Sequence, residues 1–295
     1  MLQKLQFRPG INRNVTNYSN EGGWFECDKV RFLDGYPEKL RGWERYSPFE
    51  ILGTCRGMFG WITSFNDNIL AIGTNKKVYL EVGTNFNDIT PLRDTPSATM
   101  TINTFSASAG STEIVVNATA HGTNVGDFVT FSGASSLGGN ITADVLNQNY
   151  EIDSIIDSDN YQISATATAN SSDTGNGGTG TTGNYEIPVG NGTLVFGYGW
   201  DTDTWGRLGW GSGSLQPVIL PLTIWFFDNF DNDLIMNVNT DGKGKVYYWE
   251  RGSATDPTAS LGTRAVKMSS RANAKNIPAE VGQIFVSQTD RHLLA

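Results

Sequence analysis

The clearest pattern along the chain is an apolar strand, an acidic turn and a second apolar strand, and this pattern recurs. Residues 65–81 contain Phe-Asn-Asp-Asn-Ile-Leu and then, after a polar turn, Val-Tyr-Leu-Glu. Residues 230–250 contain Phe-Asp-Asn-Asp-Leu-Ile and then Val-Tyr-Tyr-Trp-Glu, and a third copy begins at residues 290–295. Repeated strand–turn–strand units indicate stacked β-structure, which usually builds scaffolds or binding surfaces.

The surroundings of the first copy predict a three-stranded meander. Strands are expected over residues 58–62, 69–72 and 78–80. The Asn-Asp-Asn turn between the first two suits a hairpin, because Asn and Asp tolerate positive φ angles. Such a meander makes most of one blade of a β-propeller.

The N-terminal segment up to about Pro48 has weaker patterning. Turn residues occur at 8–10 and at 34–37, and residues 24–32 alternate imperfectly between apolar and polar. We expect an extended arm with one strand over residues 24–32.

The spacing of the copies predicts an insertion between the first two. Leu234 and Leu293 are 59 residues apart, which suits one blade, whereas Ile69 and Leu234 are 165 residues apart. The excess of 106 residues is the expected size of the insertion.

Charge indicates the same boundary. Residues 1–93 have 12 basic and 10 acidic side chains, but residues 94–241 have only Arg207 against 16 acidic ones, and residues 242–295 have 8 basic and 4 acidic. The acidic stretch should repel nucleic acid and anionic membranes.

The insertion itself is predicted to be a small β-module. It has four candidate strands, at residues 112–116, 127–131, 150–156 and 161–164, and one helical turn within residues 141–147. The Ser-, Thr- and Gly-rich tract at residues 165–183 is interpreted as a flexible return linker.

The fold class expected from these patterns is all-β, with partial or incomplete β-propeller-like repeats and an inserted small β-domain. Abundant Gly (34 residues) and a charged fraction of only 17% favour short strands and tight turns. The expected division is 1–93, an arm and first meander; 94–184, the acidic module and linker; and 185–295, further repeats with the last incomplete.

No constellation in the sequence predicts catalysis, a cofactor or a metal, and we expect no enzyme. Gly175, Gly177 and Gly180 match the dinucleotide fingerprint but lack the strand-to-helix context that phosphate binding needs. Residues 228–233 resemble a calcium loop only in composition, and residues 241–245 have the wrong spacing for a phosphate loop. His121 and His292 have no predicted partner.

Three further features carry little functional weight. Cys27 and Cys55 allow a disulfide, but two reduced and partly buried thiols are favoured. No apolar run is long enough for a transmembrane helix, and the N-terminus does not resemble a secretory signal. Trp200, Trp205 and Trp210 follow neither a helical nor a strand period, so gap-filling is favoured over a carbohydrate-stacking surface.

The N-terminal motifs bear a resemblance to a known family. They are Phe7-Arg8-Pro9-Gly10-Ile11-Asn12, the stretch Trp24–Phe32, Gly35–Lys39 and Gly42-Trp43. In these motifs the chain resembles the tail-nozzle or "packaged DNA stabilisation" proteins of short-tailed bacteriophages. The resemblance extends less specifically to the repeats and to part of the insertion.

This resemblance implies a virion structural protein, assembled in the host cytoplasm and located in the tail. Several copies, six by expectation, would form a ring below the portal and adaptor, with non-specific contact to DNA in the channel. A closed propeller needs at least about four blades, whereas this chain has two copies of the repeat and the start of a third. We therefore expect either that the sequence is truncated at Ala295 or that another subunit supplies the missing strand edge.

Charge and position suggest which residues dock the neighbouring proteins. We expect this interface to include four arginines and three aromatic residues: Arg8, Arg13, Arg31, Arg41, Trp24, Phe25 and Trp43. The alternative function is a glycan-binding adhesin or another receptor-binding tail module, and a glycosidase is a more distant third.

Overall fold

The structure is a computed structural model of the 295-residue chain. It describes residues 8–42, 44–93, 98–100, 104–178, 180–189, 222–239, 244–252, 261–271, 274–287, 289–290 and 292–295. These residues are almost entirely β-structure in several antiparallel sheets, which confirms the all-β prediction. They divide into two compact units, Met1–Pro48 and Phe49–Ala295.

The N-terminal unit contains little regular structure. A short 3-10 helix, η1 (Asn17–Ser19), precedes a hairpin of β1 (Val30–Leu33) and β2 (Tyr36–Lys39). Asp34 and Gly35 form the two-residue turn of this hairpin with φ angles of 50° and 84°, as the tight primed turns require.

The strand expected over residues 24–32 is therefore too long. Only Val30 to Phe32 of that stretch belong to β1, and Trp24 forms an isolated bridge with Ile11. Lys29, the residue directly before β1, has a φ of 57°, and this conformation interrupts an extended strand at that point.

The first repeat forms a four-stranded antiparallel sheet. Its strands are β3 (Cys55–Ile62), β4 (Asn68–Thr74), β5 (Val78–Val82) and β6 (Asn85–Asp88), arranged in sequence order. The three predicted strands are present, and β6 adds a fourth. The acidic turn between β3 and β4 places Asn66 at a φ of 64°, as its composition indicated.

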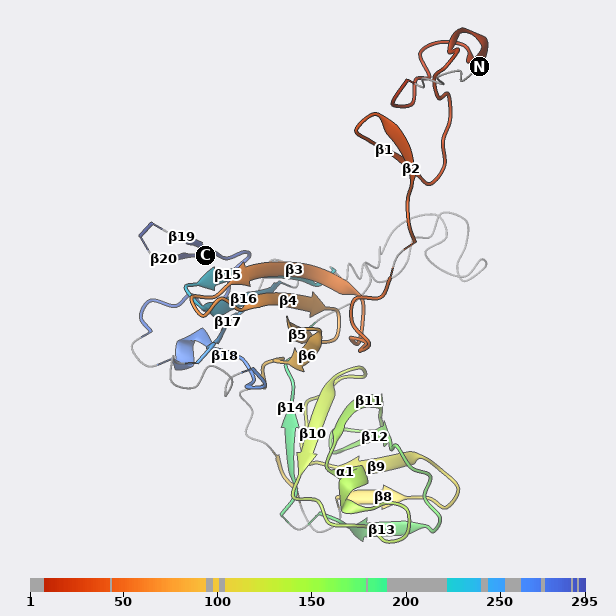
Figure 1. Cartoon of the computed structure of the whole chain (residues 1–295). Coiled ribbons are helices and arrows are strands. Elements are labelled where there is room, and N and C mark those ends of the chain that lie inside the picture. The colour runs from red at the N-terminus through yellow and green to blue at the C-terminus, as the bar shows by residue number, and fades with distance from the viewer. Residues whose placement is uncertain are drawn as a thin grey trace, which may run out of the picture. The chain divides into compact units, whose positions relative to one another are not determined.

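The second repeat forms a sheet of the same topology. Its strands are β15 (Ile224–Phe230), β16 (Asp233–Asn239), β17 (Val246–Trp249) and β18 (Val266–Lys267), again in sequence order. Asp231 in its acidic turn has a φ of 56°. The repeat seen in the sequence is thus a repeat of structure (Figure 1).

The third strands of the two sheets differ in register by one residue. Val78 pairs with Gly73 and faces the same core as Ile69, whereas Val246 pairs with Asn237 and faces the opposite side from Leu234. A shift of one residue turns a strand over. Aligning the Val-Tyr pair at Val78 with the one at Val246 in the sequence therefore assigns the two valines to the same face of their sheets, although they lie on different faces.

The two sheets pack against each other through a shared apolar core. The first sheet contributes Trp61, Ile69, Ala71, Val78 and Leu80 to this core, and the second contributes Trp225, Leu234, Met236, Tyr247 and Trp249. Close approach depends on glycine, because a Cβ on Gly73 would lie 2.3 Å from Cγ of Trp225. The indole nitrogen of Trp225 donates a hydrogen bond of 2.7 Å to the carbonyl oxygen of Thr74.

The second sheet is covered on its other face as well. A hairpin of β19 (Phe285–Ser287) and β20 (His292–Leu294) corresponds to the predicted third copy. Val286 and Ile284 pack there with Ile235 and Tyr248. The first strand of the second sheet, β15, contacts both β3 and β19, the first strands of the neighbouring repeats.

The insertion between β6 and β15 is a separate β-module with its own core. Eight strands form one sheet in the order β13-β8-β9-β12-β11-β10-β14-β7. Their bounds are β7 (Ala98–Thr99), β8 (Phe105–Ala107), β9 (Glu113–Asn117), β10 (Phe128–Ser132), β11 (Asn149–Ile155), β12 (Asn160–Ser164), β13 (Asp173–Asn176) and β14 (Thr182–Tyr185). All four predicted strands are among them. The predicted helical turn is α1 (Ala143–Leu146), with Thr142 as its N-cap.

The tract at residues 165–183 is not a linker, so that prediction was wrong. It contains β13, which pairs with β8, and the start of β14, which pairs with β10. Ala165 and Ala169 are buried in the module core. Small side chains bury little area, but the backbone of the tract satisfies its hydrogen bonds in the sheet, which composition alone does not reveal.

The chain enters and leaves the module at one place. Leu92 and Glu186 form an antiparallel bridge, and the amide of Arg93 donates a hydrogen bond of 2.9 Å to the carbonyl oxygen of Tyr185. No closed barrel or propeller is formed within the described ranges. Nor does any helix among them have the length and apolarity to cross a membrane.

Candidate functional site

The predicted interface residues all belong to the N-terminal unit. Arg8, Arg13, Arg31 and Arg41 are exposed, and Trp24 and Phe25 are half-buried. The rings of Trp24 and Phe32 meet edge to face at 6.0 Å. Trp43 lies outside the described residues.

Two of these arginines are engaged in surface ion pairs within the unit. Arg13 binds Glu26 at 2.8 Å, and Arg31 binds Glu38 at 2.8 Å across the β1–β2 hairpin. Exposed pairs of this kind contribute about 0–1 kcal/mol each. They orient the arginines without fixing the arm strongly.

The N-terminal unit buries no hydrophobic side chain among its described residues. Tyr18, Tyr36 and Tyr46 are each more than 70% exposed, and Leu33 and Ile11 are more than half exposed. A segment without a core gains little from folding alone. Tyrosine and arginine are enriched on surfaces that bind other proteins.

A buried charged cluster lies where the inserted module joins the first sheet. Glu186, which follows β14, accepts hydrogen bonds at Oε1 from Lys77 Nζ at 2.9 Å, Arg264 Nη1 at 2.9 Å and Asn149 Nδ2 at 3.0 Å. Lys77 and Arg264 also bind Asp88. Four segments distant in sequence therefore meet at two carboxylates.

The electrostatics of this cluster are balanced. Burial disfavours the charged form of the Asp88 carboxyl, but Lys77 and Arg264 outweigh it and hold the pKa of Asp88 below its usual value. Lys77 Nζ also lies 4.4 Å from the centre of the Phe128 ring. Two cations matched by two carboxylates make the cluster a structural lock between module and sheet.

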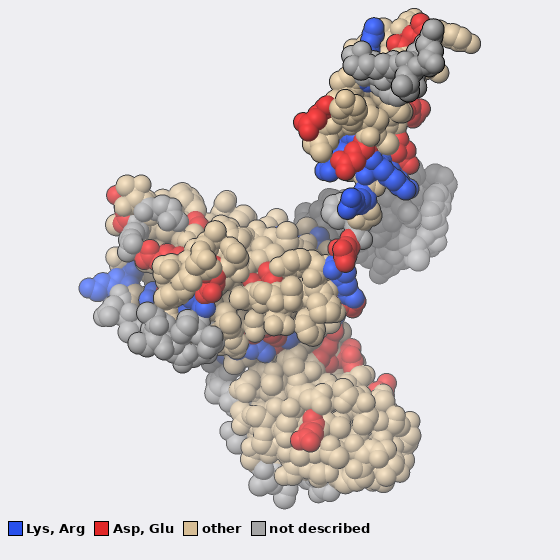
Figure 2. Space-filling model, viewed as in Figure 1, with Lys and Arg blue, Asp and Glu red and all other residues tan. Residues whose placement is uncertain are grey.

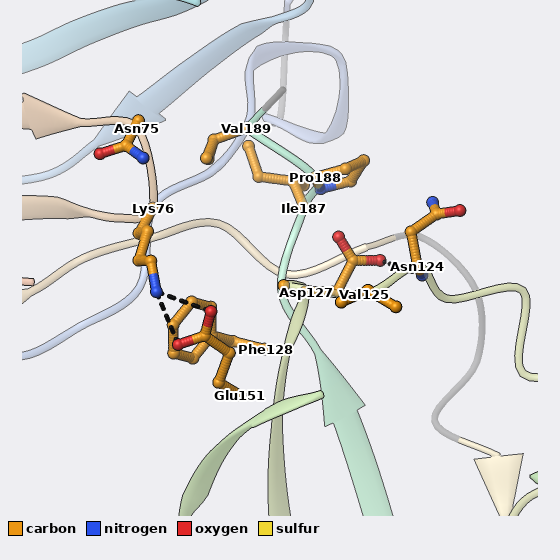
Figure 3. A pocket seen from close by; sticks show the side chains of 11 residues that line it. Asn75, Lys76, Asn124, Val125, Asp127, Phe128, Glu151, Ile187, Pro188 and Val189 are labelled. Atoms are coloured by element: carbon orange, nitrogen blue, oxygen red, sulfur yellow. Dashed lines mark hydrogen bonds and ion pairs between the residues drawn. The ribbon is translucent and has the colours of Figure 1, made fainter. Parts of the chain in front are cut away.

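Beside this lock lies a pocket of about 450 Å³ (Figure 3). Lys76 points across it to Glu151, whose two carboxylate oxygens lie 2.6 and 2.7 Å from Nζ. Asp127 and Asn124 line another side, with Ile187 and Pro188 between them and the sheets. The lysine and both carboxylates are already paired, since Asp127 binds Arg93, so the described lining residues present no unpaired charge to a ligand.

A second pocket, of about 560 Å³, shares Asn124, Ile187 and Pro188 with the first. Its polar lining includes Arg93, His121, Lys245 and Lys267. Nδ1 of His121 lies 2.6 Å from the Thr123 hydroxyl, and its Nε2 lies 3.0 Å from the Asp157 carbonyl oxygen. Local hydrogen bonds hold this histidine in place, and the sequence did not reveal them.

The motifs discounted in the sequence have structural roles. Asp228 accepts a hydrogen bond of 2.7 Å from the amide of Val286, and Asp233 accepts one of 2.9 Å from the amide of Arg251. Gly177 and Gly180 lie between β13 and β14, with no helix following them. Residues 241–243 and the three tryptophans Trp200, Trp205 and Trp210 lie outside the described residues.

The remaining candidate chemistry is limited. Cys27 and Cys55 are free thiols; Cys27 is half-buried and Cys55 is exposed. Within the described residues, no group of three or more His, Cys, Asp or Glu side chains is arranged to hold a metal ion. His292 is exposed in β20, with Nδ1 2.6 Å from the carbonyl oxygen of Asp290.

No protein-family model matches the chain, and no curated protein is similar to it in sequence. Among solved structures it has a distant likeness to a phage phi92 endosialidase, with 15% sequence identity and a TM-score of 0.25. The match covers 70% of this chain and 28% of the endosialidase. A likeness at this level indicates neither a shared fold nor a shared activity.

Proposed function

We propose that the protein is a structural component of the virion of a short-tailed bacteriophage, within the tail nozzle or hub ring. There it continues the DNA channel and retains packaged DNA, without catalysis. The observation that carries this proposal is the stack of repeats: two sheets of identical topology share one core, and the second is buried on both faces. Such an arrangement suits a load-bearing scaffold.

The stack favours a partial β-propeller. Its sheets follow each other in sequence order, and β15 lies beside the first strands of both neighbouring repeats, β3 and β19. In a propeller, the first strands of successive blades line the central channel. In this proposal further repeats or an edge supplied by a neighbouring copy complete the propeller, and six copies of the subunit form the nozzle ring.

The N-terminal arm docks onto the portal, the adaptor or other tail proteins. It has exposed arginines and tyrosines and no buried apolar residue among those described. The entropic cost of ordering such a segment is offset by the surface area that it buries on a partner. The predicted interface set, from Arg8 to Trp43, belongs to this arm.

The acidic stretch is placed away from DNA in this proposal. Residues 94–241 have 16 acidic side chains and one basic one, so they repel phosphates. On the visible face of the inserted module, Figure 2 shows acidic side chains and no Lys or Arg. The module therefore projects outward from the ring, and any DNA contact is made elsewhere and without sequence readout.

Cryo-electron microscopy of the phage particles tests the proposal. Density for the β3–β6 and β15–β18 sheets in the tail, around the channel, would support it, as would full heads that leak DNA when the gene is deleted. Particles that contain no copy of the chain would overturn it. Density showing the inserted module against DNA would overturn its outward placement.

A further inference from the structure

The second pocket, of about 560 Å³, is lined in part by one face of the second sheet. Tyr247 in β17 pairs with Lys267 in β18, and directly paired residues of antiparallel strands have their side chains on the same face. Lys245 lies two residues before Tyr247 and lines the pocket as well. The sheet therefore presents two cations and a phenol to the pocket.

The inserted module adds a cation and a histidine to the lining, but both are already bonded. Arg93 donates at Nε to the Glu186 carbonyl oxygen and at Nη1 to the Gly122 carbonyl oxygen, both at 3.0 Å. Its remaining nitrogen pairs with Asp127. Both ring nitrogens of His121 are engaged in local hydrogen bonds. These two side chains shape the pocket, so a charged ligand has to find its partners on the second sheet.

The hydroxyl of Tyr247 is a polar group that the fold leaves without a partner. The side chain is 3% exposed, and no hydrogen bond joins its hydroxyl to another described residue. By contrast, Tyr161 and Tyr185 bind each other at 3.1 Å, and Tyr248 binds Asp233. Burial raises the pKa of Tyr247 to about 12, so its hydroxyl keeps its proton at neutral pH and can donate. Buried polar groups are normally hydrogen-bonded, which makes this one a candidate ligand contact.

The charge around this hydroxyl favours an anion. Lys245 is exposed, and its ammonium makes no ion pair with a described residue. Lys267 adds a second positive charge, and Glu280, which is exposed, is the carboxylate among the described lining residues. The lining also has apolar surface, from Ile187, Pro188 and Val238. The first pocket differs, because its charges neutralise each other.

We propose that this second pocket binds a small organic anion at its phosphate or carboxylate group. Lys245 and the Tyr247 hydroxyl donate hydrogen bonds to the oxyanion, and Lys267 adds to the positive potential. Lysine is a common partner of phosphate, and hydrogen bonds to a charged group are stronger than neutral ones. The pocket lies within the range of roughly 300–1,000 Å³ that small organic ligands occupy, so its apolar lining contacts the body of the ligand.

A ligand-observed NMR titration of the full chain tests the proposal. The probes are phenyl phosphate and benzoate, which have the two head groups on the same apolar ring. Wild type should bind at least one of them with a dissociation constant on the order of 1 mM, which suits so small a ligand. Benzyl alcohol, which has the ring without the charge, should bind roughly 10-fold more weakly or less. The tighter of the two anions identifies the head group.

Two variants locate the site. Tyr247→Phe removes only the hydroxyl and keeps the ring in the core, and Lys245→Met removes an exposed charge, so circular dichroism should show both folded. Each should weaken binding of the tighter probe about 10-fold, the loss expected for a hydrogen bond to a charged group. Tyr36→Phe and Lys275→Met make the same two changes at exposed residues outside the pocket and should bind as wild type does.

Three results would overturn the inference. Wild type would bind neither anion at about 10 mM, ten times the expected dissociation constant. Tyr247→Phe and Lys245→Met would bind as tightly as wild type, which would place any binding elsewhere. Lys275→Met would lose as much affinity as Lys245→Met, which would assign binding to general surface charge. The proposed role in the tail is independent of all three, since a structural ring needs no small ligand.

Discussion

Lys77 and Glu186 form an ion pair in the interior of the protein. Nζ of Lys77 lies 2.9 Å from Oε1 of Glu186, and the two side chains are 3% and 1% exposed. Lys77 belongs to the β4–β5 turn of the first sheet, whereas Glu186 follows the last strand of the inserted module. The pair fixes the module to the stack through charges that water cannot reach.

Lys77→Met should destabilise the protein strongly. The substitution leaves the buried Glu186 and the half-buried Asp88 with Arg264 as their remaining cation, and breaking a buried pair such as Lys77–Glu186 costs about 3 kcal/mol or more. Urea unfolding at pH 7 measures this loss. Lys76→Met is the matched control, because the neighbouring Lys76–Glu151 pair is one-third exposed and should cost about 1 kcal/mol or less. Equal losses in the two variants would show that the buried cluster is not a lock.

Asp88 should make stability depend on pH at the acid end. Its pKa is lowered in the folded state despite burial, since Lys77 and Arg264 stabilise the carboxylate. A carboxyl with a lowered folded pKa contributes stability above its unfolded pKa of about 3.9, and this stability is lost as pH falls through the folded pKa. Stability should therefore decline below about pH 4.

Asp88→Asn separates this contribution from general acid unfolding. The variant should be less stable than wild type at pH 7, and the difference should shrink as pH falls below about 4. Asp153→Asn, at an exposed position, serves as the control and should follow wild type. Urea titrations at several pH values give the comparison, and a difference between Asp88→Asn and wild type that stays constant would contradict the assignment.

The repeated strand–turn–strand units could be predicted from sequence because each signal is local. Asn66 and Asp231 adopt the positive φ angles that their acidic turns indicated, and strands flank both turns. The strands of the inserted module were found for the same reason, from short apolar alternations between Gly-rich turns.

Long-range pairing could not be predicted in the same way. Composition marked residues 165–183 as a linker, but their backbone completes a sheet with β8 and β10. The lock was also missed, because Lys77 and Glu186 are 109 residues apart and look like ordinary surface charges. One signal was available: Lys77 directly precedes an apolar strand, where a charge is either exposed or paired.

Gly73→Ala should disrupt the contact between the two sheets. A Cβ at this position would lie 2.3 Å from Cγ of Trp225, and neither the indole nor the strand behind it can give way cheaply. Overpacking of this kind costs about 1–3 kcal/mol. Gly60→Ala on the adjacent strand is the control, since its Cβ would meet nothing closer than Leu70 at 3.7 Å. A melting temperature lowered by Gly73→Ala and preserved in Gly60→Ala is the expected result, and the reverse order would refute this packing.

Arg251→Met should loosen the two acidic turns from each other. Arg251 is 3% exposed, its guanidinium pairs with Asp67 in the first turn, and its amide binds Asp233 beside the second. The Asp67 carboxylate is 32% exposed, so water partly replaces the lost cation, and the expected cost is about 1–3 kcal/mol.

Arg271→Met provides the comparison for this last change. Arg271 is exposed and lies over the Tyr248 ring at 4.0 Å, an interaction of about 0.5–1 kcal/mol. Chemical denaturation should therefore rank Arg251→Met well below Arg271→Met in stability. Hydrogen exchange should also show faster opening at the amide of Ser64, whose bond to Asn232 joins the same two turns. Protection at Ser64 that survives Arg251→Met would mean that Asn232 alone holds the turns together.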